Sequence, residues 1–234
     1  MIPLKDDVPL SRPAVATVAL IAANTAAFLW QVLGVGLPYS VEIGGAIPYE
    51  ILTFRDVPPR DLVEPPFTIL TSMFLHGGFL HIAGNMLFLW VFGNNVEDTL
   101  GHGRFLVFYL LCGIAAGAAQ IAVAAGAGDP SSLLVPMVGA SGAIAGVLAA
   151  YMVLFPRARV LTLIPIFVFI RIVYLPASFF IGLWFVIQLV SAFLGNGGSG
   201  VAFVAHVGGF IAGWLLLRPF LPRHRRWPSR RAGW

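Results

Sequence analysis

The chain has 234 residues, of which 59% are hydrophobic and 10% are charged, and its mean hydropathy is +0.89. A soluble domain carries about 25% charged residues, so this composition excludes a water-soluble globular protein. In a bilayer each segment must satisfy its own backbone hydrogen bonds, and no segment alternates polar and apolar residues as a barrel strand would. The composition therefore predicts an all-α membrane protein.

Six apolar segments approach the length of about 20 residues that a membrane-spanning helix needs. In chain order, these predicted spans are residues 14–33, 78–95, 104–125, 136–155, 172–195 and 201–218. They make residues 14–218 one six-helix domain, which follows a cytoplasmic tail at 1–13 and precedes a basic cytoplasmic tail at 219–234. The apolar run at 160–170 is too short to span, and we expect it at the cytoplasmic interface.

The one long connection, residues 34–77, joins the first two predicted spans and should lie on the outer side. Its first part is rich in proline, and a loop this long in a compact domain is usually functional. Its last part, from Phe67 into the second span, is apolar but contains Gly77 and Gly78. This pattern predicts a hairpin embedded in the membrane.

The net charge of +4 and the pI of about 9.7 do not indicate nucleic-acid binding, because the basic residues are divided by side. With six spans, only Arg55 and Arg60 fall on one side. The other twelve basic residues fall on the opposite side: Lys5, Arg12, Arg104, Arg157, Arg159, Arg171, Arg218, Arg223, Arg225, Arg226, Arg230 and Arg231. The positive-inside rule then places both termini in the cytoplasm. We expect a multi-pass protein of a bacterial plasma membrane.

Neither a metal nor a cofactor is expected. The single cysteine, Cys112, lies in an apolar run and cannot form a disulfide within the chain. The three histidines His76, His81 and His206 show no His-Glu-x-x-His pattern and have no thiolate partner, which argues against zinc. We assign His76 to loop structure rather than to the site.

Four polar side chains inside the predicted spans need an explanation, since such groups are costly in lipid. They are His81 and Asn85 in the second span, Ser141 in the fourth and His206 in the sixth. Each alone fits helix packing or an interhelical hydrogen bond. Counted from the expected outer ends of their spans, however, all four fall in one layer of the outer leaflet. A serine, a histidine and several donors in one layer are the parts that acyl transfer requires.

The chemistry follows from these residue types. His206 would accept the Ser141 proton as a general base and return it to the leaving amine. His81, Asn85 and the backbone N–H of Ser141 would face the oxyanion. Because no carboxylate is present to orient His206, the sequence predicts a Ser-His dyad rather than a triad.

The motifs His81-Ile-Ala-Gly-Asn85, Gly139-Ala-Ser141-Gly142 and Ala205-His206-Val-Gly-Gly209 resemble those of the rhomboid family in order and spacing. The resemblance implies a six-helix rhomboid bundle with Ser141 as nucleophile and His206 as base.

The same resemblance implies that His81 and Asn85 form the oxyanion site. It also implies that Gly209 and Gly213 let the sixth helix pack closely on the fourth, in agreement with a Gly-x-x-x-Gly spacing. Two positions depart from the family pattern. Ala145 stands where some members carry an aromatic that stacks on the base, and Phe67 stands where many carry tryptophan.

The expected function is that of an intramembrane serine endopeptidase, which cleaves transmembrane segments of other membrane proteins near the outer leaflet. Its partners would be those substrates and the lipid bilayer. The alternative is a catalytically inactive relative that binds membrane proteins. A transporter or channel is a weaker alternative, since its polar residues would line a path across the whole bilayer.

Overall fold

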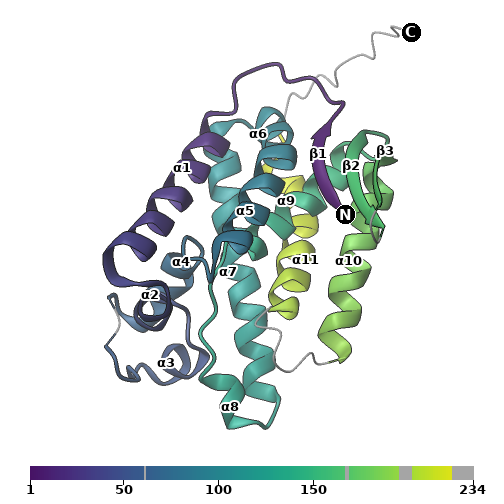
Figure 1. The fold of residues 1–234 in the computed structure, drawn as a ribbon. Helices are drawn as coiled ribbons and strands as arrows, with labels where there is room; N and C mark the ends of the chain where they lie inside the picture. Colours follow the sequence, from purple (N-terminus) through teal and green to yellow (C-terminus); the bar gives the residue numbers. More distant parts are fainter. Residues whose placement is uncertain (61, 167–168, 195–201, 223–234) are drawn as a thin grey trace, which may run out of the picture.

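The computed structural model describes residues 1–60, 62–166, 169–194 and 202–222 (Figure 1). Its helices are α1 (Val15–Trp30), η1 (Gln31–Val35), α2 (Leu37–Gly44), α3 (Pro48–Thr53), η2 (Pro65–Phe67), α4 (Thr68–Ser72), α5 (Phe79–Phe88), η3 (Leu89–Gly93), α6 (Asn94–Leu100), α7 (His102–Gly126), α8 (Pro130–Leu133), α9 (Ser141–Leu154), α10 (Ala177–Leu194) and α11 (Phe203–Phe220). Its strands are β1 (Ile2–Asp6), β2 (Arg159–Ile166) and β3 (Phe169–Pro176). Most of the expected basic tail lies outside the described residues.

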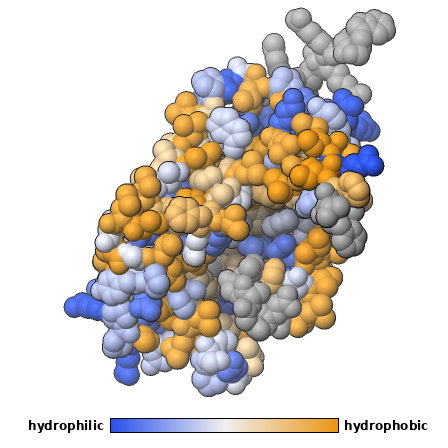
Figure 2. Space-filling model, viewed as in Figure 1, coloured by the Kyte–Doolittle hydropathy of each residue, from blue (hydrophilic) through white to orange (hydrophobic). Residues whose placement is uncertain are grey.

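Four helices in the described part of the chain are long and apolar enough to cross a membrane: Val15–Val35, α7, α10 and α11. The helix α9 is apolar but has only 14 residues. The segment from α5 through η3 to α6 is helical without interruption from residue 79 to residue 100. These helices make the chain a multi-pass membrane protein, while the count of six spans stays a prediction. Figure 2 shows apolar side chains over much of one face of the molecule.

The centre of the fold is α9, which packs against both α7 and α11. Every residue of α9 from Gly142 to Tyr151 is buried. Glycines make this possible: a Cβ atom on Gly209 of α11 would overlap the carbonyl oxygen of Gly142, and one on Gly213 would overlap the backbone of Gly146. Two Gly-x-x-x-Gly pairs therefore face each other, so that the backbones of α9 and α11 touch.

A three-stranded antiparallel sheet with the order β1-β2-β3 is the main departure from the all-α prediction. The fold is mostly helical, as expected, but residues 1–13 include a strand rather than only a tail. The run expected at the interface, 160–170, contributes its described residues to the paired strands β2 and β3, and the helix expected at 172–195 begins only at Ala177. Continuous runs of apolar, β-branched residues such as Val160–Ile166 fit a buried strand as well as a helix, and periodicity does not separate the two.

The long connection at 34–77 is largely helical and is tied to the rest of the fold by hydrogen bonds. Gln31 contacts His76 through both its amide atoms: its Oε1 accepts from the backbone N–H and its Nε2 donates to the backbone carbonyl. Ala46 and Met137 exchange two backbone hydrogen bonds of 2.9 Å. Met137 is thereby held in a β-bridge and the helix α9 begins only at Ser141, so the predicted span at 136–155 is not helical over its first five residues.

Candidate active site

Ser141 and His206 come together at the centre of the bundle. The Nε2 atom of His206, on α11, lies 2.8 Å from the Oγ atom of Ser141. Ser141 is the first residue of α9, whereas the sequence predicted a helical span that begins at residue 136. His206 is the fourth residue of α11 and is 8% exposed. The contact is short enough for proton transfer between the two side chains.

The other nitrogen of His206 also has a partner, which the sequence analysis did not identify. Gln188 of α10 lies with its Oε1 atom 2.7 Å from Nδ1 of His206. The Nε2 atom of Gln188 donates a longer hydrogen bond of 3.4 Å to the carbonyl of Trp184, one turn earlier. Both atoms of the Gln188 amide are therefore used.

Two aromatic rings flank His206. The ring centroid of Trp184 lies 5.8 Å from that of His206 at an interplanar angle of 36°, and Phe203 approaches the imidazole edge-on at 6.4 Å. Ala145, where a stacking aromatic is absent, is fully buried in α9. In this chain α10 and the start of α11 supply the aromatic contacts that α9 lacks.

His81 and Asn85 lie one turn apart on α5, close to the segment that leads into Ser141. A Cβ atom on Gly139 would lie 2.7 Å from Nε2 of His81 and 3.7 Å from Nδ2 of Asn85. Gly139 has a φ of +122°, so both its backbone conformation and its surroundings require glycine. The Nδ2 atom of Asn85 is buried and has no hydrogen-bond partner among the described residues. It is therefore available as a donor in the cavity that Ser141 also lines.

A large cavity of about 1330 Å³ opens beside these residues. Its lining includes Ser141, His206, His81 and Asn85, together with side chains of α10. Figure 2 shows a hollow in the surface with hydrophilic side chains inside it. The four candidate residues therefore line one and the same cavity.

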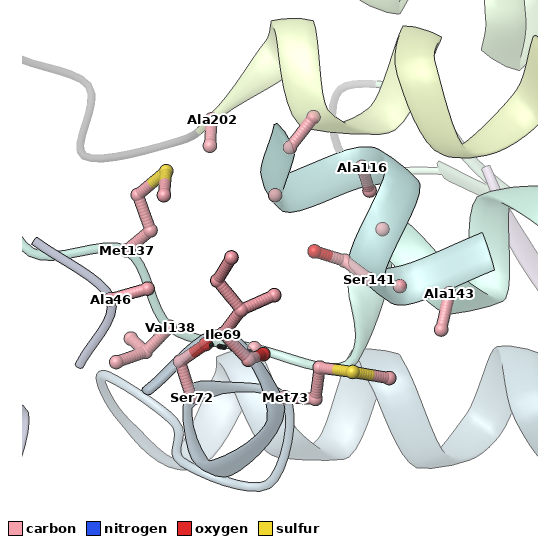
Figure 3. A pocket seen from close by; sticks show the side chains of 15 residues that line it. Ala46, Ile69, Ser72, Met73, Ala116, Met137, Val138, Ser141, Ala143 and Ala202 are labelled. Carbon is pink, nitrogen blue, oxygen red and sulfur yellow. Dashed lines mark hydrogen bonds between the residues drawn. The ribbon is translucent and has the colours of Figure 1, made fainter. Parts of the chain in front are cut away.

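A second, smaller cavity of about 50 Å³ lies on another side of Ser141 (Figure 3). Figure 3 shows the Ser141 hydroxyl pointing into it from α9, with Ser72, Met73 and Met137 around it. This volume is sufficient for a water molecule, which needs at least about 10–15 Å³.

His76 is fully buried and lies edge-on to His81, with 5.1 Å between ring centroids. Neither of its ring nitrogens has a partner in the described part of the chain, and its backbone is held by Gln31. Gln120 of α7 is a further amide that the sequence analysis passed over, and its Oε1 accepts from the backbone N–H of Ala205. Within the described ranges, no three His, Cys, Asp or Glu side chains are grouped as metal ligands.

Comparison with known proteins gives the family. The profile of the Rhomboid domain matches residues 64–223, well over half of the chain. The chain belongs to the rhomboid family. The family predicted from the three motifs is thereby confirmed.

Curated relatives agree with this assignment. Rhomboid protease GluP of Bacillus subtilis is 34% identical over 129 residues, which are 54% of this chain and 24% of the relative. Rhomboid protein 1, mitochondrial, of Saccharomyces cerevisiae is 35% identical over 102 residues, or 44% of this chain and 29% of the relative. Presenilin-associated rhomboid-like protein, mitochondrial, of Homo sapiens is 36% identical over 104 residues, or 43% of this chain and 26% of the relative. The alignments thus span about a quarter of these rhomboid proteins.

Proposed function

We propose that this rhomboid is a serine-type endopeptidase that cleaves transmembrane segments of other membrane proteins. The observation that supports this most directly is the 2.8 Å contact between Ser141 Oγ and His206 Nε2, on the wall of the large cavity. A serine hydroxyl bonded to an imidazole nitrogen is the arrangement of an activated nucleophile. One relative with 34% identity is named a rhomboid protease, which agrees with this chemistry.

The reaction has two halves. In the first, Ser141 Oγ attacks the carbonyl carbon of the scissile peptide while His206 Nε2 takes the hydroxyl proton. The C–N bond then breaks, the amine leaves with that proton, and the acyl group stays on Ser141. In the second half, a water loses a proton to His206 and attacks the ester, which releases the acid and restores Ser141.

The oxyanion of each tetrahedral intermediate needs hydrogen-bond donors. Nδ2 of Asn85 is available because it has no partner among the described residues. The backbone N–H of Ser141 is also available, since the first N–H groups of a helix have no intrahelical acceptor. We assign His81 to the same site because its Nε2 lies beside Gly139, two residues before the nucleophile.

The substrate class follows from the membrane position of the site. An intact helix conceals its carbonyls from a nucleophile, so the substrate segment must unwind before cleavage. Glycine or proline near the cleavage site lowers the free energy of unwinding. We propose both termini in the cytoplasm, which places the site in the outer leaflet of a bacterial plasma membrane. A periplasmic reporter fused after Trp234 should then be inactive, and an active one would reverse the topology.

Active-site labelling tests the function. A fluorophosphonate probe added to the purified full chain should label Ser141, and Ser141→Ala should remove the label. His206→Ala should slow labelling strongly because the base is lost. A wild-type chain that is neither labelled nor able to cleave a single-span substrate in proteoliposomes would instead favour the inactive membrane-protein-binding relative.

A further inference from the structure

We infer that Gln188 is a positioning residue for His206, so that the proposed dyad functions as a Ser141–His206–Gln188 triad with a neutral amide as its third member. This inference rests on the proposed function and deepens the same site. Its basis is the 2.7 Å contact between Gln188 Oε1 and His206 Nδ1, across from the 2.8 Å contact of His206 Nε2 with Ser141. Each of the two ring nitrogens of His206 therefore has a hydrogen-bond partner.

The orientation of the Gln188 amide decides which tautomer His206 adopts. An amide oxygen only accepts hydrogen bonds and an amide nitrogen only donates them. The hydrogen bond from Gln188 Nε2 to the Trp184 carbonyl directs the nitrogen away from the imidazole and leaves Oε1 facing Nδ1. Nδ1 must then carry the hydrogen, and Nε2 presents its lone pair to the Ser141 hydroxyl. That tautomer is the one a general base requires.

A neutral third member suits this location. Gln188 is 8% exposed and lies in α10, one of the helices long and apolar enough to cross a membrane. An ionised carboxylate there would be costly, whereas an amide fixes the tautomer without bringing a charge into the lipid. Amides orient the histidine in Cys-His-Asn proteases in the same way. The amide cannot stabilise the imidazolium as a carboxylate would, so we expect a moderate contribution to rate.

Trp184 connects the same helix to the base a second time. Its carbonyl holds the Gln188 amide and its ring lies 5.8 Å from the His206 ring. Two residues one turn apart on α10 therefore fix the rotation of the His206 side chain. If α10 moves away from α11, His206 loses its Nδ1 acceptor and its aromatic neighbour together. Competence of the base is thus linked to the position of α10.

Two substitutions at position 188 test the inference in the full chain. Gln188→Met keeps the side-chain length and removes the acceptor, so kcat should fall roughly tenfold with KM and melting temperature close to wild type; tenfold is about 1.4 kcal/mol. Gln188→Glu restores an acceptor and should regain most of the kcat. Its carboxylate also stabilises the protonated imidazole, so the acid limb of the pH–rate profile should move to higher pH. Among the described residues, His81 of α5 is the titratable side chain whose charge acts on His206.

Val190→Ala is the matched control, since Val190 lies on α10 and is 49% exposed. It should keep the wild-type kcat and pH profile. Wild-type kcat in Gln188→Met would overturn the inference. The inference would also be overturned if Gln188→Met lost activity together with melting temperature and Gln188→Glu did not restore the activity. That result would show that Gln188 is a packing residue. If wild type itself fails to label at Ser141, the proposed function is what has failed.

Discussion

The two helices that hold His206 in place differ in how they meet their neighbours. The helix α11, which carries His206, touches the backbone of α9 through Gly209 and Gly213. The helix α10, which carries Gln188, borders the large cavity. A Cβ atom added to its Gly182 would meet no atom of the described residues within 4 Å. Ser141 and His206 thus belong to a closely packed unit, while Gln188 comes from a helix with free space beside it. If Ser141 and His206 act as proposed, the nucleophile and the base are fixed in position and the cavity beside α10 leaves room for a substrate.

The largest expected effect lies in the closely packed unit. Ser141→Ala should leave no detectable cleavage of a transmembrane substrate, and His206→Ala nearly none, because no other described side chain contacts Ser141 as a base. Melting temperature in detergent should stay near wild type in both variants. Full activity in Ser141→Ala would show that the contact serves only helix packing.

Asn85 lines the same cavity as Ser141 and His206, and its substitution tests the proposed oxyanion site. Asn85→Ala should lower kcat by about 10²–10³, or ~2.7–4 kcal/mol, as for the loss of one oxyanion donor, while cleavage stays measurable. Since Nδ2 of Asn85 has no partner among the described residues, the substitution removes no hydrogen bond of this atom there, and the melting temperature should change little. A strong fall in melting temperature with unchanged kcat would assign Asn85 to packing instead.

A pair of glycine substitutions compares the two helices directly. Gly209→Val in α11 should lower both melting temperature and activity, because the new side chain overlaps the Gly142 carbonyl and overpacking costs about 1–3 kcal/mol. Gly182→Ala in α10 meets nothing within 4 Å and should keep or slightly raise the melting temperature, since alanine favours helix by about 1 kcal/mol. Equal melting temperatures for the two variants would contradict the difference in packing.

The smallest expected effect on melting temperature concerns Glu97, whose carboxylate accepts hydrogen bonds from residues at the start of α1. Glu97 of α6 is fully buried and accepts from the hydroxyl and N–H of Thr17, from the N–H of Ala16 and from His102. Burial raises the pKa of Glu97. The hydrogen bonds from Thr17, His102 and the backbone together lower it by more than burial raises it, so the pKa lies below its usual value of 4.5. Its stabilisation is therefore complete above pH 4.5 and is lost as the pH falls through the lowered pKa.

Glu97→Gln should accordingly melt at a lower temperature than wild type at neutral pH, and the difference should shrink in acid. Melting curves at several pH values measure it. A difference that is independent of pH would show that the amide loses shape complementarity rather than charge-assisted hydrogen bonds.

The sequence predicted the family and most of the proposed site for a physical reason. A serine and two histidines are costly in lipid, so few explanations account for Ser141, His81 and His206 on separate spans. The contact of Gln188 with His206 joins two different helices, and no local pattern contains it. The amide of Asn85 was therefore identified among the polar residues of the spans, but that of Gln188 was not. Its signal was available: glutamine is the most polar residue of α10.

Other features depend on contacts that no local pattern contains. The strand β2 pairs not only with the neighbouring β3 but also with β1, which lies over 150 residues earlier in the chain. The start of α9 at Ser141 is set by the pairing of Met137 with Ala46, two segments that the sequence assigned to a span and to a loop. The helix expected from residue 136 therefore begins five residues later, at Ser141.

Because β1 pairs with β2, the amino-terminal strand can fold only after the chain as far as β2 has been synthesised. Ile2 pairs with Leu163, and Asp6 accepts hydrogen bonds from both Asn95 and Tyr151. At about 5–20 residues synthesised per second, the first strand waits roughly 10–30 s for its partner strand to be made. Such distant pairing is slow to form because the intervening chain must be closed into a loop. The amino-terminal strand thus joins the fold only after α1 to α9 have been made, and its docking is a late step of biogenesis.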